Sequence, residues 1–241
     1  MKFAVAVLTI AIAVGSAAAQ APTLRIVTED PGLPSELFYG SVKVKPLRLR
    51  PGTNIPITIN DNDFFVHQQY VDFLSRLADP AGFNFWLGNI TPCGSDPNCI
   101  AAMRVNVSAA FYMSIEFQQS GFLVYRAHLA AFGNLPGAPV PVRRESFMPE
   151  SRSIGNGVLV GTQGWELRLE NNKVAYFLAF VQRSDFQTAY PNTMSADQFV
   201  TQLDTRAGNV LSGAEKSQIV ANLSAGPTSF SLRAAALRAV A

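Results

Sequence analysis

The sequence predicts a mainly α-helical protein, a helical bundle of about seven or eight helices preceded by a short extended or β-like arm. Three observations support this fold class. From residue 61 onward, apolar residues recur at spacings of three and four, the period of a helix with one buried face. Asp-Pro pairs, and Ser residues followed three positions later by Gln or Glu, mark helix starts. Before residue 61, apolar and polar residues alternate instead, and Pro and Gly interrupt them.

The N-terminus has the three parts of a cleavable signal peptide. Lys2 supplies a positive charge, residues 3–14 are mostly apolar, and residues 16–19 are small. The apolar run is shorter than the roughly 20 residues that a membrane span needs. We therefore expect residues 1–19 to be removed and the mature protein to be exported, whether secreted, periplasmic or at the cell surface. We expect no transmembrane segment after cleavage.

The charges of the chain are nearly balanced. The sequence has 19 Lys and Arg against 17 Asp and Glu, scattered rather than in runs, and cleavage removes only Lys2. This pattern does not indicate nucleic acid or an acidic membrane face as a partner. The roughly 220 remaining residues suffice for one large domain or two small ones.

Residues 20–60 are predicted to form an extended or short-strand arm. Apolar and polar residues alternate at 24–28, 42–45 and 55–59, and Pro and Gly interrupt the pattern repeatedly. A period of two is typical of strands. The segment is too broken to build a core of its own, so we expect a few short strands or an extended arm ahead of the helices.

The first helix is predicted to begin at residue 61. Asp61 or Asp63 is placed to cap its first turn. Together with Asn62, these carboxylates also form an oxygen-rich cluster of the kind that calcium prefers, although the loop glycine and terminal glutamate of an EF-hand are missing. Capping is the leading interpretation, and calcium binding by Asp61 and Asp63 is the alternative. We expect no other cofactor.

Two Asp-Pro pairs predict the next two helices, because Asp accepts hydrogen bonds from the first amides and Pro favours the first helical position. The pair at 79–80 opens the second helix, and the pair at 96–97 opens a longer one, from about residue 98 to residue 119. Gly121 is its predicted stop. Its inward residues are predicted to be Ile100, Met103, Val107, Phe111 and Ile115.

Cys93 and Cys99 are the only cysteines, and they lie in one loop that contains Pro and Gly. In an exported protein such a pair is most simply a disulfide, and closing so short a loop stabilises by about 2 kcal/mol on the chain-entropy model. A metal site would need more ligands than two thiols, and no histidine is near in sequence. We therefore predict a Cys93–Cys99 disulfide that clips a turn.

Five more helices are predicted in the rest of the chain. The fourth covers 122–132, and a long irregular passage follows it, with three prolines between residues 135 and 141. A long helix runs from about residue 163 to residue 183. The last helix, within 226–241, is rich in Ala and Leu, and we expect it to be frayed or cut off from a packing partner. The two remaining helices open at capping boxes, Ser195 with Gln198 and Ser212 with Glu215.

No constellation of side chains predicts a catalytic site. His67 and His128 stand outside any metal-ligand spacing, and each is predicted to lie at the surface or boundary of a helix. The glycine-rich segment 155–161 lacks the lysine of a P-loop, which favours a flexible loop. Most aromatic residues repeat at helical spacing and are predicted to lie in the core. We therefore predict no catalytic or cofactor-binding residues, and no metal ligands beyond Asp61 and Asp63.

One segment of the chain resembles a known family. It consists of an aromatic-rich predicted helix, a turn glycine and the pair Phe-Trp. Residues 64–76, with 79–82 and 85–86, resemble the bacterial family called domain of unknown function 4214. In that family the aromatic-rich helix ends in Gly-Arg-x-Pro-Asp, and a glycine and Tyr-Trp follow. The chain departs from the pattern at Ser75 and Ala78, where Gly and Pro would be usual.

The resemblance covers residues 61–225 and implies an all-helical module, distantly similar to phycobilisome linker domains. Such modules occur in secreted and surface proteins beside adhesin-type repeats, and the resemblance supplies no catalytic residues. Exported members often follow a Calx-beta module. Residues 57–63 look like the final strand of one, although too few residues precede them for the whole domain. Longer relatives continue past the equivalent of Ala241, which suggests a truncated C-terminus.

Two functional hypotheses follow. The leading one is an exported, non-enzymatic helical module that binds a protein or a cell-surface glycan at or outside the cell envelope. The alternative is a secreted hydrolase that uses paired carboxylates as acid and base. Glu166 and Glu170 lie four residues apart on one predicted helix, so they could face one cleft, but exposed solubilising positions explain them equally. The other candidate carboxylates are Glu116 and Asp185.

Overall fold

The computed structural model describes residues 24–27, 36–39, 42–46, 58 and 60–241 of the 241-residue chain. The chain divides into two units, residues 1–58 and residues 59–241. The predicted signal peptide, residues 1–19, lies outside the described residues.

The first unit contains a three-stranded antiparallel sheet of β1 (Leu24–Val27), β2 (Glu36–Tyr39) and β3 (Val42–Pro46), in the order β1-β2-β3. Leu24 of β1 pairs with Tyr39 of β2, and Tyr39 also pairs with Val42 of β3. β1 and β3 coincide with two of the three alternating stretches of the arm. The third stretch, 55–59, lies outside the described residues apart from Thr58.

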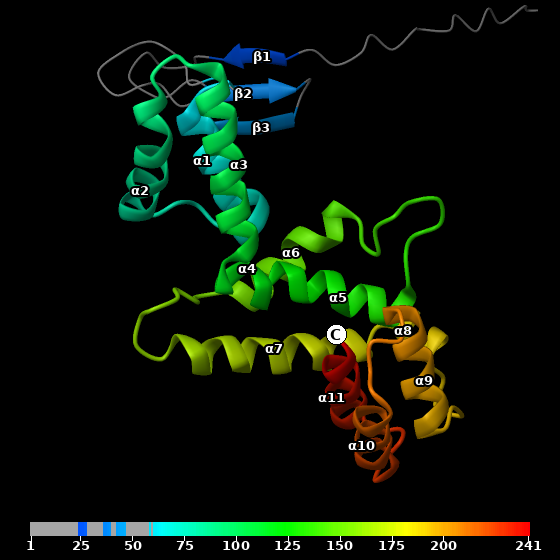
Figure 1. Cartoon of the computed structure of the whole chain (residues 1–241). Coiled ribbons are helices and arrows are strands. Elements are labelled where there is room, and N and C mark those ends of the chain that lie inside the picture. Colours follow the sequence, from blue (N-terminus) through cyan, green and yellow to red (C-terminus); the bar gives the residue numbers. More distant parts are fainter. Residues whose placement is uncertain (1–23, 28–35, 40–41, 47–57, 59) are drawn as a thin grey trace, which may run out of the picture. The chain divides into compact units, whose positions relative to one another are not determined.

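The second unit is helical, which confirms the predicted fold class. Its described residues form eleven α-helices and one 3₁₀ turn. This is more than predicted, because one predicted helix is divided, one helix lies in the passage expected to be irregular, and one lies at 184–189, where no helix was predicted. Figure 1 shows them in chain order, from α1 in cyan to α11 in red. Among the described helices, none is long and apolar enough to cross a membrane.

The first three helices are α1 (Asn62–Leu74), α2 (Pro80–Ile90) and α3 (Pro97–Met113). They begin where the sequence predicts, with Asp61 at the N-cap position of α1. The Asp79 carboxylate accepts a hydrogen bond from the Gly82 amide at 2.8 Å, and the Asp96 carboxylate accepts one from the Asn98 amide at 2.9 Å. Both Asp-Pro pairs therefore start helices as predicted.

The third predicted helix is divided at Ser114, and α4 (Ile115–Gln119) begins directly after it. Ser114 has an extended backbone, with φ −62° and ψ 144°, and its hydroxyl accepts a hydrogen bond from the Phe117 amide at 3.2 Å. Ile115, predicted to point inward, is 55% exposed. Gly121, predicted to end this helix, is the first residue of the next one. The apolar spacing continued across a polar cap, so these three predictions were wrong.

The middle of the chain forms α5 (Gly121–Phe132), α6 (Arg144–Gly155), α7 (Trp165–Val181) and α8 (Ser184–Ala189). α5 and α7 confirm two predicted helices. The passage from Gly133 onward was expected to be irregular, but α6 occupies much of it. Its prolines at 136–141 lie outside any helix, and only Pro149 falls within α6. The prolines at 136–141 therefore exclude a helix from the loop, as predicted, but not from the segment that follows it, where the prediction was wrong.

The last three helices are α9 (Ala196–Ala207), α10 (Gly213–Ser224) and α11 (Phe230–Val240). Reciprocal hydrogen bonds form at both predicted capping boxes, one at Ser195 and one at Ser212. α11 packs against α5, α7, α9 and α10. Its Leu237 is completely buried, so the expectation that this helix is frayed was wrong.

Two hydrophobic clusters fill the helical unit. One is built from α1 to α4, with Val66 and Phe111 buried in it, and the other from α5 to α11, with Phe180 fully buried in it. The ring of Phe147 on α6 packs against both. Most predicted core aromatics are in these clusters or at their edges, but Phe85 is 61% exposed. A second exception, Tyr112, is also exposed.

The predicted disulfide is present. Cys93 ends a 3₁₀ turn (Thr91–Cys93), and Cys99 lies in the first turn of α3. Their Cα atoms are 5.5 Å apart, within the range of a disulfide. The bridge and the Asp96 cap together hold the start of α3, the helix that lines one side of the groove described below.

Reduction of this disulfide is expected to lower the free energy of unfolding by about 2 kcal/mol, because the short loop regains its freedom in the unfolded chain. Urea unfolding with and without dithiothreitol measures the loss. The double variant Cys93→Ser, Cys99→Ser should unfold like the reduced protein and respond to dithiothreitol no further. Equal stability of the oxidised and reduced wild type would contradict this role.

Candidate functional site

A polar cluster surrounds Glu150 of α6, whose side chain is only 14% exposed. The ring nitrogen Nε2 of His128 lies 2.9 Å from Oε2 of Glu150, and the Tyr176 hydroxyl donates to the same oxygen at 2.8 Å. Arg183 donates through Nη1 to the other oxygen, Oε1, at 3.0 Å. The partners come from α5, from α7 and from the residue before α8. The cluster therefore joins helices that are far apart in sequence.

The electrostatics of this cluster favour an ionised Glu150. Burial raises the pKa of Glu150, but the hydrogen bonds and charges of His128 and Arg183 outweigh it, so the pKa lies below its ordinary value. Burial and the neighbouring Glu150 hold the pKa of Tyr176 well above its ordinary value. An anionic carboxylate whose two oxygens are committed to donors is suited to fixing α5, α6 and α7 in place. It is poorly suited to taking a proton from a substrate.

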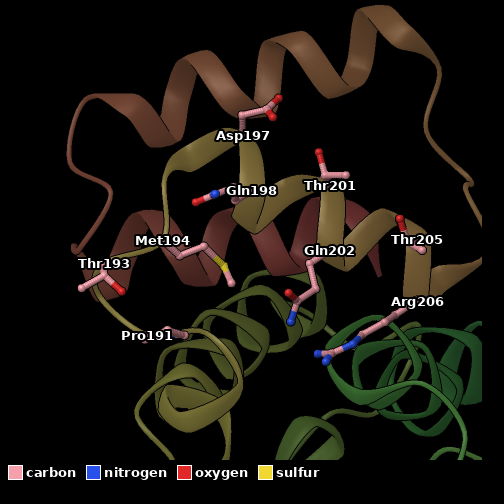
Figure 2. Close-up of a pocket in the computed structure, with 9 residues that line it drawn as sticks. All are labelled: Pro191, Thr193, Met194, Asp197, Gln198, Thr201, Gln202, Thr205 and Arg206. Carbon is pink, nitrogen blue, oxygen red and sulfur yellow. The ribbon is translucent and has the colours of Figure 1, made fainter.

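A polar hollow of about 740 Å³ lies beside α9 (Figure 2). Figure 2 shows Arg206 extending from α9 toward α5, where its guanidinium donates to the Ala131 carbonyl, and at 2.9 Å to the Tyr190 hydroxyl. Gln202 donates to the Ala189 carbonyl at 3.1 Å. The side chains of Arg206 and Gln202 are therefore engaged in holding α9. Its remaining polar groups are Thr193, Asp197, Gln198, Thr201 and Thr205.

An apolar groove of about 620 Å³ lies between α1 and α3 and is called here the α1–α3 groove. Phe65 and Phe73 line it from α1. Val105 and Met113, on its α3 side, are 67% and 71% exposed. The other residues that line it are Arg104, Ser108, Ala109 and Tyr112. Large apolar side chains are thus presented to solvent together rather than singly.

Arg104 supplies the only charge on the lining of the α1–α3 groove, within the described residues. Its guanidinium donates to the Asn62 side chain at 2.9 and 3.1 Å and to the Asn60 carbonyl at 2.6 Å, and it lies over the Phe65 ring at 5.1 Å. These acceptors are neutral. They hold the guanidinium in position without neutralising its positive charge, so the charge remains available to a molecule bound in the groove.

The predicted calcium candidates lie at the start of α1. Asp61 is at the N-cap position and Asp63 is in the first turn. In the part of the chain that the structure describes, no three His, Cys, Asp or Glu side chains gather closely enough to hold a metal ion. Calcium binding by Asp61 and Asp63 stays a prediction.

The candidate hydrolase carboxylates are either paired with arginines or exposed to solvent. Glu116 forms two hydrogen bonds with Arg76, at 2.7 and 3.0 Å. Glu170 is engaged by Arg238 in the same way, at 2.6 and 2.7 Å, and Glu166 is exposed on the same helix. The fourth candidate, Asp185, is exposed on α8.

Sequence reasoning missed Glu150 and misplaced one histidine. His128 was expected at the surface or boundary of a helix, but it is 8% exposed and engages Glu150. His67, in contrast, is half-buried and stacks on Phe83 at 4.3 Å. The partners of Glu150 lie 22 to 33 residues away, so no local spacing could reveal the cluster. An isolated Glu within a weakly patterned segment gave no signal.

Comparisons of the chain with protein-family models, with curated proteins and with solved structures found no match. The resemblance of residues 61–225 to domain of unknown function 4214 therefore stays a prediction.

Proposed function

We propose that the protein is an exported interaction module that binds an amphipathic helix of a partner protein in the α1–α3 groove. One observation carries the proposal: a long, exposed and uncharged face of α3 beside that groove. α3 has 17 residues, so its face is about 25 Å long. The exposed apolar residues of this face are Ala101, Ala102, Val105, Ala109, Tyr112 and Met113.

The spacing of this face suits a second helix. Ala101, Val105, Ala109 and Met113 stand four residues apart, so they form one ridge along α3. The alanines permit a close approach, and the larger residues can insert between side chains of the partner. Burying Val105 and Met113 gains about 1.5 to 3 kcal/mol each. Apolar anchors at such intervals are the recognition mode of a helix in a groove.

Charge further restricts the partner. Arg104 stands at the rim of the groove with neutral acceptors only among the described residues. An acidic side chain at the edge of the partner's apolar face would pair with it. The occupant is therefore an amphipathic helix with an acidic border.

Export supports a function at or outside the cell envelope. It rests on the signal-peptide pattern of residues 1–19 and on the Cys93–Cys99 pair, since disulfides persist in oxidising compartments. The resemblance to exported helical modules without catalytic residues supports the same reading. The glycan alternative would use the polar hollow beside α9, but no aromatic ring lines that hollow among the described residues.

Val105 and Leu167, which are equally exposed, provide a matched test of binding in the α1–α3 groove. Each is 67% exposed, but only Val105 lies on the α1–α3 groove. Wild type, Val105→Asp and Leu167→Asp are used as baits in envelope extract, with and without calcium. We expect one protein to be retained by wild type and Leu167→Asp and lost with Val105→Asp, because a carboxylate in the groove opposes apolar burial.

The captured protein must then yield a helical peptide that binds the purified protein in isothermal titration calorimetry. Val105→Asp is expected to weaken this binding at least about tenfold, or 1.4 kcal/mol. If no protein distinguishes the Val105→Asp bait from the Leu167→Asp bait, the groove is not the binding face. Capture that requires calcium would support Asp61 and Asp63 as calcium ligands.

A further inference from the structure

A small pocket, called here the α7–α11 pocket, lies between two helices that pack against each other (Figure 1). Its volume is about 360 Å³. Phe177 of α7 and Ala234 of α11 line it and are 1% and 6% exposed, so they form its floor. Val174 and Leu178 line it from α7 and are open to solvent. A mostly apolar pocket of this volume is within the size range of small-molecule sites.

Small side chains on α11 leave this space open. Ser231, Ala235 and Ala239 line the pocket, are exposed, and stand four residues apart, so they follow one another along one face of α11. Their positions span about 12 Å of the helix. Val174 and Leu178 also stand four residues apart, on α7. The pocket therefore runs between a wall of larger apolar side chains and a wall of small ones.

Arg238 carries the only charge on the lining of the α7–α11 pocket, within the described residues. Its guanidinium donates through Nη1 and Nη2 to the two carboxylate oxygens of Glu170, at 2.6 and 2.7 Å. A guanidinium has five N–H donors, so three donors of Arg238 are not used by this pair. Both side chains are partly exposed, and such an ion pair is weak. Arg238 can therefore bind a second carboxylate that enters the pocket.

We propose that the α7–α11 pocket binds a small amphiphilic carboxylate, whose apolar body lies against Val174 and Leu178 and whose carboxylate pairs with Arg238. At roughly 30 Å³ per non-hydrogen atom, the share of one water molecule in the liquid, the pocket holds about twelve such atoms. The planar guanidinium suits a carboxylate geometrically. This site is formed by other helices than the α1–α3 groove, so it does not depend on the proposed partner helix.

Titration of the purified full chain, followed by NMR of its backbone amides, tests this site. Sodium decanoate represents a fatty acid, 4-phenylbutyrate represents an aromatic acid, and 4-phenylbutyramide is the neutral analogue of the second. We expect saturable shifts in the amides of α7 and α11 with at least one acid. 4-Phenylbutyrate is expected to bind at least about fivefold more tightly than its amide, because only the acid pairs with Arg238.

Filling the pocket should abolish this binding. Ala235→Phe places a large ring in the space beside α11, and we expect it to weaken binding of the acids by at least about tenfold. The matched control is Ala221→Phe, the same change at an exposed alanine of α10. It should leave the affinity within about twofold.

Two charge variants test the role of Arg238. Glu170→Gln removes the competing carboxylate, so we expect it to tighten binding of 4-phenylbutyrate by about threefold or more and to leave the amide within about twofold. Arg238→Gln should remove the preference for the acid over the amide. Both changes affect a partly exposed pair, so the fold should survive them.

Circular dichroism establishes that each variant is folded before titration, and the two charge variants decide if Ala235→Phe does not fold. Binding of decanoate alone supports a fatty acid as the occupant, and binding of 4-phenylbutyrate alone supports an aromatic acid. No saturable binding of either acid overturns the site, as do shifts confined to other helices. Equal affinity of the acid for wild type and a folded Arg238→Gln also overturns it.

Discussion

Replacing Arg233 with Ala is expected to lower the free energy of unfolding by about 4 kcal/mol. Arg233 of α11 is only 1% exposed. Its guanidinium donates to the carbonyls of Pro227 and Tyr190, both at 2.7 Å, and of Pro191 at 3.1 Å. Ala would leave three carbonyls without their donors and open a cavity beside Phe199, whose ring the guanidinium covers at 5.1 Å. Urea unfolding followed by circular dichroism gives the loss.

The same helix offers a matched control. Arg238 also makes two strong hydrogen bonds, but its side chain is 33% exposed and its partner Glu170 is 49% exposed. Arg238→Ala is expected to cost less than about 1 kcal/mol, because exposed ion pairs contribute little. A cost for Arg233→Ala as small as that for Arg238→Ala would show that the loops around Pro191 and Pro227 do not need this clamp.

Replacing Glu150 with Gln is expected to lower the free energy of unfolding by about 3 kcal/mol, because Arg183 loses its ion-pair partner and His128 and Tyr176 lose a carboxylate acceptor. Glu145 is the matched control. It lies on the same helix, is exposed, and has no ion pair among the described residues. Glu145→Gln should change the stability by less than about 0.5 kcal/mol.

The effect of Glu150 has a defined dependence on pH. The pKa of Glu150 is lowered in the folded protein, below an unfolded value of about 4.3. Its stabilisation is therefore fully present at neutral pH and is lost as the pH falls through the folded pKa. Wild type and Glu150→Gln should converge in urea unfolding at strongly acidic pH. A gap that stays constant into acid would show that the charge of Glu150 is not what holds the cluster.

Local signals predicted most of the helix starts. Asp79 and Asp96 each cap a helix through bonds that reach only two or three residues ahead, and Ser195 and Ser212 do the same. Such bonds form wherever the local pattern occurs, so the sequence is a sufficient guide to them. The break at Ser114 was missed because its cap lies inside an apolar repeat. An apolar repeat does not show whether a given residue, such as Ile115, packs against another helix in the folded protein.

The candidate sites were harder to predict, because they depend on contacts between distant segments. The periodicity of α3 predicts one apolar face, yet its second apolar face, with Val105 and Met113, becomes visible only once the neighbouring helices leave it open. Likewise Lys173 looks like an ordinary surface charge in the sequence, and only the folded structure shows that it is 8% exposed.

The ring of Phe147 has a consequence for how the helical unit moves. Each hydrophobic cluster is filled mainly by its own helices, and this ring packs against both. Because most of the first cluster comes from its own helices, we expect the part built from α1 to α4 to open as a cooperative unit, at a lower free energy than global unfolding. Its backbone amide hydrogens would exchange with solvent through that partial opening. The amide hydrogens of α7 and α11 would exchange only through global unfolding. A helix seated on α3 would slow exchange in the first group alone.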